Sequence, residues 1–158
     1  MKKWIATILA AVTCMTMLTA CGGKKAPQKE PATADVAKAV VEKLTFRDEL
    51  MVLDDKQVDV IYRLDEDKIA EKTGYVSGSR ATAEEVSVFK VKDAADTQMV
   101  KDAIAERIDD QKIAYENYVP EEMVKINGAV TLQNGNYLIL VMADDTSAVE
   151  ETFNQQFE

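Results

Sequence analysis

Few residues of this chain have side chains suited to covalent catalysis or to tight metal binding. There is no histidine among the 158 residues, which excludes histidine-activated nucleophiles and imidazole metal ligands. The two cysteines are Cys14, inside an apolar run, and Cys21, which directly follows Ala20. Other chemistry must therefore come from carboxylate, Ser, Lys, Tyr or Arg side chains.

Two short motifs match those of serine β-lactamases and penicillin-binding proteins. Ser87 and Lys90 have the spacing S-x-x-K, and Lys72-Thr73-Gly74 matches K-T-G. In those enzymes the Ser and Lys share a helical face. The residues around Ser87 instead predict a strand, in which positions three apart point to opposite faces. The order of the two motifs is also reversed, so we interpret both as coincidental.

The acidic residues best suited to binding a cation form four short clusters. An EF-hand calcium loop needs Gly at its sixth position and Glu at its twelfth, and the cluster that begins at Asp65 has neither. We expect these clusters to cap helices or to face solvent, with no metal ion and no cofactor bound. The clusters are Asp54-Asp55, Asp65-Glu66-Asp67, Asp109-Asp110 and Asp144-Asp145.

Arg107 is one candidate for ligand binding, because a guanidinium group can hold an anion or a carboxylate. It lies next to the apolar stripe of a predicted helix, and Tyr118 continues that stripe. The alternative, which we favour, is an ion pair on the helix surface with Glu106 or Asp110. The stem of Arg107 would then cover apolar surface.

The segment 74–80 is a second candidate. Its sequence, GYVSGSR, is small and polar and offers hydrogen-bond donors from Tyr75, Ser77 and Arg80. Loops of this kind often carry binding residues. A solvated connector is the favoured alternative.

The N-terminal residues have the parts of a secretion signal. Lys2 and Lys3 are followed by an uncharged apolar run over residues 4–18, which is shorter than the ~20 residues of a membrane-spanning helix. The sequence Leu18-Thr19-Ala20-Cys21 resembles the lipobox of bacterial lipoprotein precursors. That resemblance implies cleavage after Ala20 and a lipid on Cys21. An uncleaved anchor with an incidental cysteine is the alternative.

These features predict a signal peptide over 1–20, a lipidated Cys21 with a flexible tether over 21–34, and a single domain over 35–158. The tether has no large apolar side chain and cannot bury a core. Beyond the signal, 17 Lys and Arg face 28 Asp and Glu, a side-chain charge of −11. Such a surface is unsuited to nucleic acid or anionic headgroups. We therefore expect the lipid to hold the protein on the outer side of the cell membrane.

Hydrophobic spacing predicts the elements of the domain. We expect helices near 35–47, 54–62, 96–117 and 120–126, strands at 75–79 and 86–92, a hairpin of 129–132 with 137–142, and a closing helix that carries Phe153 and Phe157.

Particular residues predict how these elements begin and turn. Asp54 with Gln57 and Ser147 with Glu150 match capping boxes, and Thr82 matches the cap of a single helical turn. Asn134-Gly135 favours a type I′ turn between the hairpin strands.

The fold class is α+β, with an antiparallel sheet of about four strands and helices packed mainly on one face. The run 137–142 is apolar without alternation. It predicts a central strand covered on both faces, or a strand with one face reserved for a partner.

Four features together resemble a family of bacterial envelope lipoproteins defined by a domain of unknown function. They are Tyr62 with Leu64, the run Ala83-Glu84-Glu85-Val86-Ser87-Val88-Phe89-Lys90, Arg107 followed by Tyr118-Val119-Pro120-Glu121, and Gly135-Asn136-Tyr137. The resemblance covers about residues 36–157. It implies an extracytoplasmic lipoprotein and assigns no catalytic residue.

The sequence favours a non-catalytic, membrane-anchored module that binds a protein or a small ligand. A small envelope enzyme with carboxylate, Ser or Lys chemistry is one alternative. An accessory subunit of an envelope complex is another.

Overall fold

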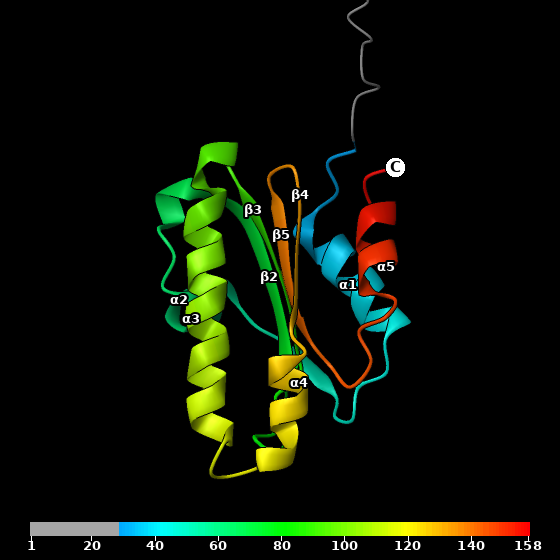
Figure 1. The fold of residues 1–158 in the computed structure, drawn as a ribbon. Coiled ribbons are helices and arrows are strands. Elements are labelled where there is room, and N and C mark those ends of the chain that lie inside the picture. Colours follow the sequence, from blue (N-terminus) through cyan, green and yellow to red (C-terminus); the bar gives the residue numbers. More distant parts are fainter. Residues whose placement is uncertain (1–28) are drawn as a thin grey trace, which may run out of the picture.

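The computed structural model describes residues 29–158, so the predicted signal 1–20, its cleavage position at Ala20 and the lipid site Cys21 lie outside the described residues. Figure 1 shows the arrangement of the helices and strands. In chain order the main elements are α1 (Thr33–Lys43), β1 (Leu50–Val52), α2 (Asp55–Tyr62), β2 (Ile69–Ser77), β3 (Glu85–Val91), α3 (Thr97–Tyr115), α4 (Met123–Asn127), β4 (Val130–Asn134), β5 (Tyr137–Met142) and α5 (Val149–Gln155). Short 3-10 turns over Glu66–Lys68, Ala94–Asp96 and Pro120–Glu122 precede β2, α3 and α4.

A five-stranded antiparallel sheet forms the centre of the fold, in the order β1-β2-β3-β5-β4. The α+β class is confirmed, with five strands rather than about four. The additional strand is β1, which pairs with the end of β2. It is three residues long, too short to give an alternating pattern in the sequence.

Helices cover both faces of the sheet, which corrects the expectation that they pack mainly on one face (Figure 1). α2, α3 and α4 lie on one face, and α1 and α5 lie on the other. β5 runs between the two layers and is buried along its whole length. Leu138 and Leu140 pack toward α3, whereas Ile139 and Val141 pack toward α1. The unbroken apolar run therefore reflects a strand covered on both faces.

The capping box at the start of α2 is confirmed. The backbone N–H of Gln57 donates to Asp54 Oδ1 over 2.8 Å, and the backbone N–H of Asp54 donates to Gln57 Oε1 over 2.9 Å. These bonds satisfy two groups that the first helical turn leaves without partners. The helix then ends at Arg63, which adopts a left-handed conformation with φ of 52°.

The β4–β5 hairpin is present, but its turn is not the predicted type I′. Asn134 lies in β4 opposite Tyr137, so Gly135 and Asn136 are the central turn residues. Gly135 has a φ of 55°, whereas Asn136 has no positive φ. A type I′ turn needs positive φ at both positions.

Two predicted helix caps are absent. Thr82 lies in an extended connection that leads into β3, and its side chain contacts Glu122 and Lys125 instead. Ser147 does not cap α5, which begins at Val149 without a side-chain cap. The backbone N–H of Ser147 donates to Asp145 instead.

The folded domain begins before residue 35, where the sequence placed its boundary. Thr33 is buried at the start of α1, and its hydroxyl lies 2.9 Å from that of Thr73 in β2. Pro31 accepts a hydrogen bond from the Tyr137 hydroxyl over 2.8 Å, and Glu30 pairs with Lys90. The last residues of the predicted tether therefore belong to the domain.

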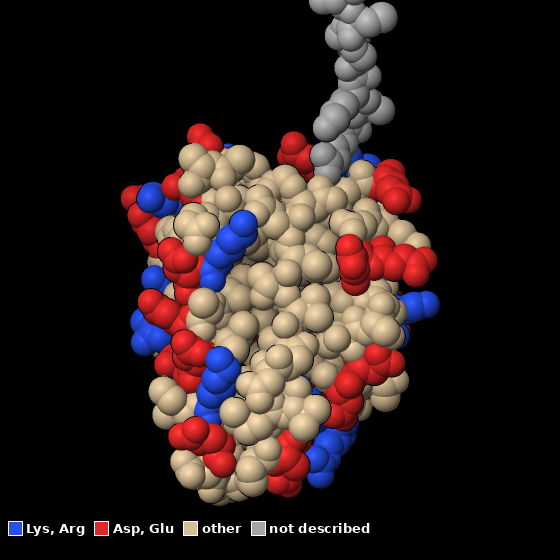
Figure 2. Space-filling model, viewed as in Figure 1, with Lys and Arg blue, Asp and Glu red and all other residues tan. Residues whose placement is uncertain are grey.

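The charged residues lie mainly over the helices on the face shown in Figure 2. The middle of that face, over the hairpin strands, is largely uncharged. Within residues 29–158, no helix is both long and apolar enough to cross a membrane.

Candidate ligand-binding site

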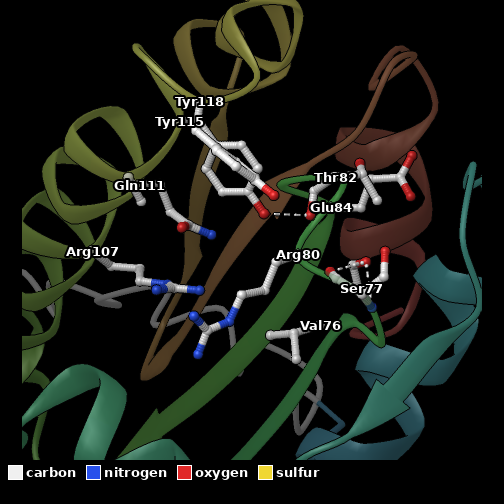
Figure 3. A pocket seen from close by; sticks show the side chains of 11 residues that line it. Val76, Ser77, Arg80, Thr82, Glu84, Arg107, Gln111, Tyr115 and Tyr118 are labelled. Carbon is white, nitrogen blue, oxygen red and sulfur yellow. Dashed lines mark hydrogen bonds between the residues drawn. The ribbon is translucent and has the colours of Figure 1, made fainter.

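A pocket of about 690 Å³ lies between the C-terminal half of α3 and the connection from β2 to β3 (Figure 3). From α3 and the turn after it come Arg107, Gln111, Ala114, Tyr115 and Tyr118. The opposite wall is formed by the end of β2 and the connection, with Val76, Ser77, Ser79, Arg80, Thr82 and Glu84. The volume is within the range of small-molecule sites, about 300–1,000 Å³.

The pocket residues of α3 share one face of the helix because they recur at steps of three and four. Further toward the N-terminus the same face carries Val100 and Ile104, which are buried in the core on the α3 side of the sheet. The face becomes polar at Arg107 and Gln111. α3 is therefore anchored by its first half and presents its second half to the pocket.

Arg107 is held by a buried carboxylate of β3. Its Nε and Nη2 donate to Glu85 Oε2 over 2.9 and 2.8 Å. The other oxygen, Glu85 Oε1, accepts from Ser87 Oγ over 2.7 Å and from the Tyr62 hydroxyl. Glu85 is fully buried, and the Arg107 side chain is 17% exposed. The Nη1 group of Arg107 makes no hydrogen bond within residues 29–158, so it remains available at the pocket.

Two ionisable groups of this cluster have shifted pKa values. Burial is the largest single effect on the pKa of Arg107 and lowers it, but the charge and hydrogen bonds of Glu85, together with Tyr62 and Asp110, raise it by more in sum, so the net pKa lies above the ordinary value. Burial and the charge of Glu85 raise the pKa of Tyr62 well above its ordinary value. Arg107 therefore stays charged and Tyr62 stays neutral.

A second buried cluster fixes the wall opposite α3. Lys125 Nζ lies 2.9 Å from Thr82 Oγ1. It also lies 3.1 Å from Glu84 Oε1 and 3.1 Å from Glu122 Oε2. Glu122 also accepts hydrogen bonds from Thr82 Oγ1 (2.8 Å) and from the backbone N–H of Ala83 (3.0 Å). These bonds tie α4 to the β2–β3 connection. The hydroxyl of Tyr115 adds a bond of 2.7 Å from α3 to the Thr82 carbonyl.

Glu122 and Lys125 of the second cluster are ionised. Burial alone would raise the pKa of Glu122, but hydrogen bonds from Ala83, Thr82 and Lys125 lower it below the ordinary value. Burial alone would lower the pKa of Lys125, but hydrogen bonds to Glu122 and Glu84 reverse that effect and raise it. Arg47 also pairs with Glu122 over 3.2 Å, so each carboxylate of this wall has a cationic partner.

Gln111 is a polar pocket side chain whose burial is not explained by contacts within the described chain. It is 8% exposed, yet its amide makes no hydrogen bond within the described part of the chain. Buried side-chain amides are nearly always hydrogen-bonded. No fully enclosed side-chain nitrogen or oxygen of residues 29–158 lacks a partner, so the Gln111 amide must reach the open space of the pocket. Figure 3 shows it pointing there.

Arg80 contributes a second guanidinium. It lies at the exposed turn of the β2–β3 connection, and it makes no ion pair within the described part of the chain. Figure 3 shows Arg80 and Arg107 extending toward one another inside the pocket. The Glu84 carboxylate is turned away from them and accepts hydrogen bonds from the backbone N–H groups of Arg47 and Asp48.

Comparison with protein-family models finds a match to the domain of unknown function DUF4358 over residues 32–143. The chain belongs to the DUF4358 family. The resemblance to a family defined by a domain of unknown function is thereby confirmed, and the lipoprotein character of its members stays a prediction. No curated protein and no solved structure matches the chain. All the pocket residues of this DUF4358 domain lie within the matched region.

The structure brings together four of the five candidate binding residues. Arg107, Tyr118, Ser77 and Arg80 all line the pocket. Tyr75 does not, because it lies in β2 and packs against the core on the α1 side of the sheet.

The favoured interpretation of Arg107 as a surface ion pair with Glu106 or Asp110 is wrong. Those two carboxylates pair with Arg63 of the DUF4358 domain instead, and Arg107 pairs with Glu85. The segment 74–80 is also divided: Gly74 to Ser77 belongs to β2, and only its end forms the connection.

Sequence analysis missed the pocket roles of Gln111, Tyr115, Thr82 and Glu84. Gln111 continues the helical spacing of the apolar residues Val100 and Ile104. A polar residue inside such a stripe was the signal that could have identified it. Within residues 29–158, no three acidic or thiol side chains of the DUF4358 domain gather closely enough to hold a metal ion.

Proposed function

We propose that this DUF4358 protein is a lipid-anchored, extracytoplasmic binding module that takes a small ligand in the pocket beside α3. The observation that carries the binding role is the Gln111 amide, which is buried to more than nine tenths and has no partner within the described chain. A ligand in the pocket would find this amide free to donate and accept hydrogen bonds.

The pocket walls support a binding role. The Lys125 cluster fixes the β2–β3 connection, and the Glu85 cluster fixes Arg107. A site whose polar groups are already positioned binds more tightly, because less conformational entropy is lost on binding. The carboxylates Glu84 and Glu85 are occupied by their own partners, so the proposal assigns them to positioning the site.

Blocking the pocket tests the binding role. Ala114 is exposed and lines the pocket, so Ala114→Trp would fill it without disturbing the core. We expect a fragment screen by NMR on the full-length chain, in mild detergent, to give ligands that shift the Gln111 side-chain amide signals. Those ligands should fail to bind Ala114→Trp.

Ala105→Trp is the matched control, because Ala105 is exposed on α3 and does not line the pocket. Ligands should bind this variant as they bind the unmodified chain. Fragments that bind elsewhere, or that bind Ala114→Trp unchanged, would contradict the pocket assignment. Product formation from a bound fragment would support the enzyme alternative instead.

The anchoring part of the proposal rests on residues 1–21. A basic start, an apolar run and small residues before Cys21 together match a lipoprotein signal. Two or more acyl chains on one cysteine would give durable attachment, since a single chain binds a bilayer only marginally.

Metabolic labelling with an alkyne-bearing fatty acid in bacterial cells tests this anchor. We expect the unmodified chain to be labelled and to fractionate with the membrane, and Cys21→Ala to lose the label. Cys14→Ala is the control, because it changes the other cysteine and should retain the label. Labelling of Cys21→Ala would overturn the assignment.

A further inference from the structure

We infer that the pocket takes a small organic monoanion, a carboxylate carried on an apolar body of about the size of an aromatic ring. This inference rests on the proposed binding function and specifies the class of ligand. It is carried by the Arg80 guanidinium, the free Nη1 group of Arg107 and the aromatic wall next to them (Figure 3).

The two guanidinium groups favour a negative charge in the pocket. Arg80 has no ion-pair partner within residues 29–158, and Arg107 has one N–H-bearing nitrogen that Glu85 does not use. A guanidinium presents its N–H groups in a plane that matches a carboxylate. Gln111 lies beside them on α3 and can donate from its amide to the same anion.

The remaining charges around the pocket limit the ligand to about one negative charge. Glu84 lines the wall, and Asp48 lies behind it, where it accepts hydrogen bonds from Ser77 Oγ and the Ser79 backbone N–H. Lys125 is already surrounded by Glu84, Glu122 and Asp144. Arg80 is therefore the one uncompensated charge among the described pocket residues, too little for a polyphosphate.

The other wall favours an apolar body. Tyr115 uses its hydroxyl to bond Thr82, so its ring is the part that it offers to the pocket. Tyr118 is 75% exposed, although its ring could bury a large apolar area. Ala114 and Val76 add aliphatic surface. Aromatic side chains exposed at a pocket mouth typically pack against a ligand.

Matched ligands that differ only in charge test this inference. One set is 4-phenylbutyrate, 4-phenylbutyramide and 4-phenylbutylamine, with further aryl-alkyl sets built in the same way. Each is titrated into the full-length chain in mild detergent while the Gln111 and arginine side-chain signals are followed by NMR. We expect the acids to bind about tenfold more tightly than the amides, and the amines not to bind.

Two variants assign the charge to Arg80. Arg80→Gln should reduce the affinity of the acids to that of the amides. Lys101→Gln removes one positive charge from the opposite part of α3, where Lys101 is exposed and has no ion pair within the described chain. Lys101→Gln should leave the affinities of the acids and the amides unchanged, since salt screens the interaction between an exposed Lys101 and a ligand in the pocket.

The outcomes separate the ligand class from the binding function. If the amides or amines bind the pocket as tightly as the acids, the anion assignment is wrong and the binding module stands. An acid affinity that Arg80→Gln leaves unchanged also overturns the assignment. If no member of any set, and no fragment of a wider screen, binds at the pocket, both proposals fail.

Discussion

At the scale of single residues, the pocket combines side chains that the fold needs with one that the fold does not use. Arg107 and Glu85 are partners of each other in a buried cluster, so a change at either one affects both folding and the site. Gln111 is buried but has no partner within the described chain. Residues at functional sites often break local rules in this way.

Replacing Gln111 should therefore separate binding from stability. Gln111→Met keeps the size of the side chain and removes an amide that makes no hydrogen bond to residues 29–158. We expect the free energy of unfolding to stay the same or to rise by up to about 1 kcal/mol, while ligands of the pocket lose affinity. Chemical denaturation and the NMR titration measure the two effects.

Gln98→Met is the control for that substitution. The Gln98 amide donates to Asp102 over 2.8 Å on the exposed side of α3, so its loss should lower stability by a few tenths of a kcal/mol. A loss of more than about 1.5 kcal/mol in Gln111→Met would mean that the amide has a structural partner.

At the scale of elements, the Lys125 cluster connects α4 to the β2–β3 connection, two segments that are far apart in the sequence. The hydrogen bond from Thr82 to Glu122 spans 40 residues. The ion pairs of Lys125 with Glu84 and Glu122 stabilise the domain only while both partners are charged, because an unpaired charge in the interior is costly.

The free energy of unfolding should fall at acid pH, because Glu122 then becomes protonated and loses its ionic contacts. Its pKa is lowered from the ordinary value of 4.5, so its contribution is complete above about that pH and is lost as the pH falls through the lower, folded-state value. Glu122→Gln should lower the unfolding free energy near neutral pH by about 3 kcal/mol. It should also make the acid side of the stability profile shallower.

Urea denaturation at a series of pH values measures this effect. Glu121→Gln changes the exposed neighbour, which makes no ion pair within the described chain, and it should leave the profile nearly unchanged. Asp48 and Asp145 also have lowered pKa values, so some acid dependence remains in both variants. Parallel profiles for Glu122→Gln and the unmodified chain would contradict the assignment.

Elements with a strong local signal could be predicted, and those defined by distant contacts could not. The capping box at Asp54 and the turn region near Gly135 involve residues within a few positions of one another. The strand predicted from Tyr75 begins at Ile69 in the structure. The prediction missed its first part because Lys72 is charged and gives no strand signal. In the structure Lys72 pairs with Asp59 of α2.

The same difference applies to the site. Arg107 and Tyr118 could be chosen from residue type and from their place at an apolar stripe, and Arg80 from its place in a small, polar segment. Their common pocket depends on how α3 lies along β3, and the Arg107–Glu85 pair is 22 residues apart in the chain. Nothing local in the sequence identifies Glu85 as the partner, because a carboxylate in an apolar strand has several candidate cations.

At the scale of the whole molecule, the folding unit extends beyond the region that the family model matches. That region ends at residue 143, whereas α5 follows it and buries Phe153 against α1. The ring of Phe157 lies 5.1 Å from that of Phe153 and 4.9 Å from that of Tyr137. α5 thus completes the core on the α1 side of the sheet.

Phe153→Ala should therefore destabilise the domain by about 3–5 kcal/mol, through lost burial and the cavity that remains. Thermal and chemical unfolding measure the loss. Val60→Ala is the control, because Val60 is 77% exposed and its change should stay within about 0.5 kcal/mol. Equal stability of the two variants would mean that α5 is dispensable.

The chain enters the fold at the opposite end from the pocket. Glu30 and Pro31 contact Lys90 and Tyr137, where β3 ends and β5 begins, whereas the pocket lies beside the start of β3. The length of β3, about 20 Å, separates the two ends. A domain held to a bilayer through Cys21 would therefore carry its binding site at the end of the fold opposite its point of attachment. The site would then be open to molecules that arrive from the surroundings.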